Sequence, residues 1–175
     1  MDLATFGAIM TFALELEKRA AAFYEQAARG SLEEPFSDLA RKANKRAKRM
    51  ERTRREGVQE MILEPIRGMH GDDYRVELSS DGDESELLDQ AIRLVETSIR
   101  FYQDAAGKIP VKEVARTCQR MAQESEKQKE VVDQAFKMLL GGTDPLEVMR
   151  YLGWLETQCA FLARLRDEIL ELEGK

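Results

Sequence analysis

The sequence has few of the residues that build disulfide frameworks, zinc sites and catalytic dyads, with only 2 cysteines and 1 histidine among its 175 residues. Cys118 and Cys159 form no Cys-x-x-Cys unit. Both fall on the apolar faces of helical patterns, which favours buried reduced thiols over a disulfide. Only 4 prolines and 11 glycines interrupt the chain. This composition is typical of a helix-rich globular domain rather than a disordered or collagen-like chain.

The chain also lacks an excess of positive charge and a long apolar run. Its net charge is −6, which disfavours a general nucleic-acid binder. Its longest uncharged run, Leu3 to Leu14, is shorter than the roughly 18 residues that a membrane-spanning helix requires. No basic segment of the kind that opens a signal peptide precedes that run. We therefore expect a cytoplasmic protein without a membrane segment.

What the sequence does contain is an internal repeat of helical patterns. Residues 13–28 read ALELEKRAAAFYEQAA and residues 91–106 read AIRLVETSIRFYQDAA, with the Phe-Tyr and Ala-Ala pairs in register. Each copy is followed by a second helical pattern with a hydrophobic-alanine step, at Leu39-Ala40 and at Met121-Ala122. Two helical hairpins joined by a long linker predict an all-α fold, an antiparallel four-helix bundle with one long crossover.

Glycine, proline and capping residues predict where these helices begin and end. The expected helices cover about residues 3–29, 35–55, 84–106 and 111–140, and Gly30 is expected to cap the first at its C-terminal end. The crossover covers about residues 57–83. Gly141-Gly142 ends the fourth helix, and Thr143-Asp144-Pro145 begins a fifth, amphipathic helix that runs to about residue 173. This organisation predicts a bundle over residues 1–142, with residues 143–175 packed on it or on a partner chain.

The pattern Ala-x-x-Leu-Glu-x6-Tyr, followed downstream by Leu-Ala, resembles the rubrerythrin-like branch of the ferritin-like, di-iron carboxylate family. The resemblance covers about residues 4–140. In that family each half supplies one glutamate from its first helix and a Glu-x-x-His motif from its second, and the six residues hold two metal ions. The resemblance therefore implies a bundle that binds iron or manganese and acts as a peroxidase or ferroxidase.

Most residues at the matching positions of this chain are not metal ligands. The six positions are Glu17, Ala43, Arg46, Val95, Ser125 and Gln128. Only Glu17 keeps the ligand type, and both histidine positions are changed, to Arg46 and Gln128. The resemblance implies that Glu17 and Arg46 converge, and a buried carboxylate needs a partner. We therefore expect a core ion pair between them, with no bound metal and no catalytic residue.

A metal site rebuilt from relocated ligands would draw on Glu17, Glu96, Glu124 and His70. A simpler interpretation of Glu96, Glu124 and His70 is that they are surface groups. Glu96 lies near Arg93 and Arg100 along its helix, and Glu124 lies near Arg120 and Lys127, which indicates solvated charge pairs. His70 falls in a loop before two aspartates. Iron and manganese in such bundles require imidazole together with several carboxylates, so we expect no cofactor here.

The second helical pattern carries nine Lys or Arg residues between positions 41 and 55. Such a run is usually a solvated helix face, but it can also bind an acidic protein partner or phosphate groups. No aromatic residue is interleaved for base stacking, which disfavours nucleic acid.

The sequence as a whole favours a non-catalytic binding or assembly module, expected to be a homodimer through the fifth helix. Two alternatives stay open. One is a rubrerythrin-like oxidoreductase or iron-handling protein with relocated ligands, and the other is a binder of anionic partners through the basic helix.

Overall fold

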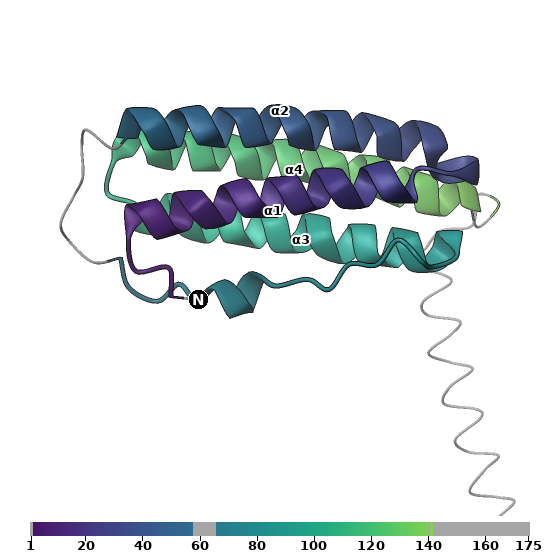
Figure 1. The fold of residues 1–175 in the computed structure, drawn as a ribbon, viewed down its shortest axis with the longest axis horizontal. Coiled ribbons are helices and arrows are strands. Elements are labelled where there is room, and N and C mark those ends of the chain that lie inside the picture. The colour runs from purple at the N-terminus through teal and green to yellow at the C-terminus, as the bar shows by residue number, and fades with distance from the viewer. Residues whose placement is uncertain (1, 58–65, 140, 142–175) are drawn as a thin grey trace, which may run out of the picture. The chain divides into compact units, whose positions relative to one another are not determined.

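The computed structural model describes residues 2–57, 66–139 and 141. Within these residues it contains four α-helices and no β-strand beyond an isolated bridge between Asp2 and His70. The helices are α1 (Phe6–Ala27), α2 (Glu33–Gly57), α3 (Glu84–Lys108) and α4 (Lys112–Leu139). They lie side by side in a bundle (Figure 1). The predicted all-α class is confirmed.

By its internal contacts the chain divides into two units, residues 1–135 and 136–175. The first unit contains α1, α2, α3, α4 as far as residue 135, and the buried core. The expected fifth helix, over residues 143–175, and residues 58–65 of the crossover lie outside the described residues. Among the described helices, none is both long enough and apolar enough to cross a lipid bilayer.

The first helix begins three residues later than the sequence predicts. Residues before it are extended because their backbone pairs with the crossover: the N–H of Leu3 donates to the carbonyl of Met69 (3.2 Å), and the N–H of Ile66 donates to the carbonyl of Ala4 (2.8 Å). Thr5 then caps α1, accepting a hydrogen bond from the N–H of Ala8 at 3.1 Å. A contact with a distant segment therefore sets where α1 begins.

The turn between α1 and α2 also differs from the prediction. α1 ends at Ala27, and Gly30 does not cap it. Gly30 has φ +55° and opens a 3₁₀ turn, η1 (Gly30–Leu32), which leads directly into α2. Pro35 therefore lies inside the first turn of α2, where its missing N–H costs no helical hydrogen bond.

Two further features connect the crossover to α3. Asp83 begins α3 with a capping box, since its side chain accepts from the N–H of Glu86 while the Glu86 carboxylate accepts from the N–H of Asp83. A second 3₁₀ turn, η3 (Gly71–Tyr74), places Tyr74 against α3, where its hydroxyl donates to Asp104 at 2.6 Å. The Tyr74 ring meets the Phe101 ring edge-on, with centroids 5.3 Å apart. The crossover is therefore anchored at both of these points.

Candidate functional site

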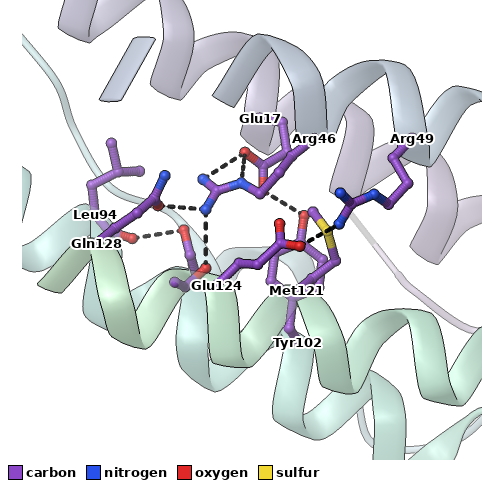
Figure 2. Close-up of polar contacts among 10 residues, drawn as sticks. Glu17, Arg46, Arg49, Leu94, Tyr102, Met121, Glu124 and Gln128 are labelled. Carbon is purple, nitrogen blue, oxygen red and sulfur yellow. Dashed lines mark hydrogen bonds and ion pairs between the residues drawn. The ribbon is translucent and has the colours of Figure 1, made fainter. Parts of the chain in front are cut away.

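A buried ion pair between Glu17 of α1 and Arg46 of α2 lies at the centre of the bundle. Nε of Arg46 donates to Oε2 of Glu17 at 2.9 Å, and Nη2 lies 2.8 Å from the same oxygen. Glu17 is 1% exposed and Arg46 is 3% exposed. Figure 2 shows the guanidinium aimed into the space between the helices. The structure thus brings together Glu17 and Arg46, the two residues expected from the sequence to form a core ion pair.

The other two helices supply the remaining partners of this pair. Nη1 of Arg46 donates to Oγ of Ser125 at 3.5 Å and to Oε1 of Gln128, both on α4. The hydroxyl of Tyr102, on α3, donates to Oε1 of Glu17 at 2.7 Å. We call these five residues, Glu17, Arg46, Tyr102, Ser125 and Gln128, the Arg46 cluster (Figure 2). Every helix of the bundle contributes at least one member.

Two of the six family positions add no polar atom to the cluster. Ala43 and Val95 are both buried, at 0% and 2% exposure. Neither side chain can hold a charge, a proton or a metal ion. Ser98, also buried, donates its hydroxyl to the carbonyl of Leu94 within α3 at 2.8 Å and takes no part. All six positions are therefore in the core, but only four of them carry polar side chains.

Burial controls the protonation of the cluster. Burial raises the pKa of the Glu17 carboxyl, while the Arg46 charge and the Tyr102 hydrogen bond oppose that shift. Burial by itself would lower the pKa of Arg46, but the Glu17 carboxylate, together with the nearby Tyr102 and Tyr24, holds that pKa above its ordinary value. Burial and the adjacent carboxylate also raise the pKa of Tyr102 well above the usual range. Tyr102 consequently keeps its proton and remains a donor to Glu17.

These residues do not fit a di-metal centre. A guanidinium has donors and no acceptor, so Arg46 cannot ligate a metal ion, and its charge repels a divalent cation. Glu17 is the one carboxylate among the six positions, and its oxygens already accept from Arg46 and Tyr102. The other oxygens are a serine hydroxyl and a glutamine amide, which are weak substitutes for carboxylate and imidazole.

The relocated ligand candidates are not gathered anywhere in the described part of the chain. No group of three or more His, Cys, Asp or Glu residues comes together within it. Glu96 pairs with Lys129 of α4 at 2.6 Å, and Glu124 pairs with Arg49 of α2 at 2.6 Å. His70 is exposed, with Nδ1 3.9 Å from an oxygen of Asp2. Glu96 and His70 lie in separate contacts, whereas Glu124 lies near enough to Glu17 for its charge to help raise the pKa of the Glu17 carboxyl.

The charge pairs differ from those that helix spacing suggests. Glu96 and Glu124 join neighbouring helices instead of pairing along their own. Arg93 pairs with Asp89 at 2.6 Å, and Arg100 donates to the backbone carbonyl of Asp73. Side chains on facing flanks of two helices compete with the i±3 and i±4 neighbours, and spacing along one helix cannot reveal that competition.

Sequence reasoning missed the role of Tyr102. The signal was present, because the Phe-Tyr pair recurs in both halves at a fixed distance of seven residues from the positions of Glu17 and Val95. Seven residues are about two helical turns, which places Tyr102 on the face of Val95 and toward the core. The repeat alone does not show that Tyr102 would donate to the carboxylate of the other half.

Two buried polar atoms have no hydrogen-bond partner among the described residues. They are the hydroxyl oxygen of Tyr24 and Nε2 of Gln128. Tyr24 is the counterpart of Tyr102 in the first half of the repeat. Of the two matching tyrosines, only Tyr102 therefore joins the cluster.

Comparison of the chain with protein-family models, curated proteins and solved structures finds no match.

Proposed function

We propose that this chain is a ferritin-like bundle of the rubrerythrin-like type in which the Arg46 guanidinium takes the place of the metal ions, and that it is a non-catalytic binding or assembly module. One observation carries the proposal: Arg46 contacts Glu17, Ser125 and Gln128, three of the other family positions. A single fixed cation therefore balances the one carboxylate that remains at these positions, as metal ions balance the larger number of carboxylates in a di-metal bundle.

The chemistry of the core supports a structural role. Redox catalysis on a di-metal site needs open coordination positions, whereas the donors and acceptors of Arg46 and Glu17 are directed at one another. Burial also raises the pKa of Cys118 to about 12. This thiol is protonated at neutral pH and is a poor nucleophile. We therefore infer that the Arg46 cluster serves to hold the four helices in register.

Metal analysis tests the proposal. The purified full chain is incubated with Fe(II) or Mn(II), desalted, and measured by elemental analysis. We expect no stoichiometric metal, because the binding positions hold a cation already. Two ions per chain after desalting would overturn the proposal and favour the alternative of a rubrerythrin-like oxidoreductase.

A restored variant is the matched control. It returns the family ligands at five positions: Ala43→Glu, Arg46→His, Val95→Glu, Ser125→Glu and Gln128→His. If the register is right, this variant binds about two ions per chain and gains thermal stability on adding metal. A variant that retains its helical circular dichroism but binds no metal would argue against the ferritin-like register.

The assembly part of the proposal concerns the fifth helix. Its predicted apolar face, which includes Tyr151, Leu155, Leu162 and Ile169, requires a surface to cover it. We propose that a second copy of the chain provides that surface in a symmetric homodimer, the commonest assembly of soluble proteins.

A further inference from the structure

A line of positive charge runs along the exposed side of α2. Its members are spaced by four, three, four and three residues, which aligns them on one face of a helix over about 21 Å. We call this set the basic stripe: Arg41, Lys45, Lys48, Arg52 and Arg55. All five side chains are exposed.

Some cations of α2 have ion-pair partners, whereas Arg54 and most of the basic stripe have none within the described residues. Arg46 meets Glu17 and Arg49 meets Glu124. At the start of the stripe, Asp38 pairs with both Lys42 and Arg41. In contrast, Lys45, Lys48, Arg52 and Arg55 form no ion pair within the residues that the structure describes.

The unpaired cations of the stripe lie close together on one face of α2. Like charges three and four residues apart destabilise a helix, and acidic side chains between them would reduce that cost. Two do flank the stripe, Glu51 and Glu56, but neither forms an ion pair within the described residues. An external anionic surface that covered the stripe would relieve this repulsion.

A shallow groove lies beside the first half of the stripe. It has a volume of about 450 Å³, and Arg41, Lys45 and Lys48 line it together with Ser37, Ala40, Asn44 and Glu25 of α1. The Asn44 amide donates to Glu25 at 2.8 Å, and this one acid forms no ion pair with Lys45 or Lys48. The groove therefore offers cations and hydrogen-bonding side chains to a ligand that lies along α2.

We propose that the basic stripe docks an acidic α-helical segment of a partner protein. Carboxylates spaced three and four residues apart on a second helix repeat at the same 5–6 Å interval as the cations of the stripe. Nucleic acid fits less well, because no aromatic side chain lines the groove for base stacking. The basic stripe is separate from the Arg46 cluster. The result of the metal analysis therefore does not decide whether the stripe binds an acidic helix.

The experiment measures binding to the full chain by fluorescence anisotropy. The probe is a labelled 21-residue helical peptide with glutamate at alternating spacings of three and four residues. A peptide of the same composition, with its glutamates distributed around the helix, is the comparison, and a single-stranded oligonucleotide of equal charge is the third ligand. We expect the striped peptide to bind tightest, with an affinity that falls as salt is raised.

The test variant is Lys45→Gln/Lys48→Gln/Arg52→Gln, and a matched control removes three exposed cations of α4, Arg116→Gln/Arg120→Gln/Lys127→Gln. Both change the net charge equally. The stripe variant should lose about tenfold in affinity, and the control should stay within about twofold of the parent. Equal losses in both variants, equal binding of the two peptides, or tighter binding of the oligonucleotide would each overturn the proposal.

Discussion

Tyr24 and Tyr102 occupy matching positions of the internal repeat and are almost equally buried, at 1% and 0% exposure, yet only Tyr102 has a hydrogen-bond partner. Its hydroxyl donates to Glu17 at 2.7 Å, whereas the Tyr24 hydroxyl has none among the described residues. The two halves of the bundle are therefore alike in sequence pattern and different in chemistry.

This difference predicts opposite outcomes for the same substitution. Tyr102→Phe removes a hydrogen bond to a buried carboxylate and should lower the free energy of unfolding by about 2 kcal/mol. Tyr24→Phe removes a buried hydroxyl that has no partner, and should be neutral or stabilising by up to about 1 kcal/mol. Urea unfolding measures both. Equal destabilisation by the two changes would show that Tyr24 has a partner of its own.

The Glu17–Arg46 pair should show strong energetic coupling. Arg46→Met leaves Glu17 buried without its counter-charge and should cost about 3 kcal/mol of stability. Adding Glu17→Gln removes the stranded charge and should restore much of that loss. A double-mutant cycle measures the coupling, and additive effects would contradict the pairing.

The more exposed pair Arg49–Glu124 provides a matched comparison for that cycle. The two ionic side chains are 30% and 35% exposed. Water screens such a pair, so Arg49→Met should cost less than about 1 kcal/mol. A cost similar to that of Arg46→Met would mean that lost packing, and not the stranded charge, dominates both variants.

The stability loss of Arg46→Met should depend on pH. Burial raises the pKa of Glu17, and Arg46 opposes that rise, so removing Arg46 raises the pKa further. The native state then holds the Glu17 proton more firmly than the unfolded state does. The free energy of unfolding of the Arg46→Met variant therefore falls as pH rises through the native pKa of Glu17. It recovers as pH falls toward the ordinary glutamate pKa of 4.5.

Urea unfolding of the parent and of Arg46→Met at pH 4.5 and pH 7.5 checks this pH dependence. We expect the difference between the two proteins to be smaller at the lower pH. The Glu17→Gln/Arg46→Met variant is the control, since it lacks the titrating group and should show no such change. A loss of equal size at both pH values would show that Glu17 is not the group responsible.

The homodimer proposal predicts a change of mass on truncation. Light scattering should give twice the chain mass for the full protein and the single-chain mass for a version that ends at Gly142. A full-length monomer would contradict the dimer. A truncated protein that remains dimeric would move the interface from residues 143–175 to the bundle.

Local sequence determined which faces of the helices are buried. The helical period places Glu17, Ala43, Val95 and Ser125 on apolar faces, and the structure buries all four. Periodicity is a property of one segment, so it can be read without knowing the neighbours. The positions of the four helices could also be predicted from the sequence, since all four expected segments are helical over most of their length.

Tertiary structure decided which partner each buried or flanking group would have. Glu124 faces Arg49 across two helices, Tyr102 and not Tyr24 meets Glu17, and the backbone of Leu3 pairs with Met69 instead of extending α1. Each of these contacts joins residues more than 60 positions apart in the sequence. Such contacts depend on how the helices are rotated and shifted against one another, and that arrangement is set by the packing of all four helices together. The sequence by itself therefore determined that a polar group would be buried at position 17, and only the fold determined what would neutralise it.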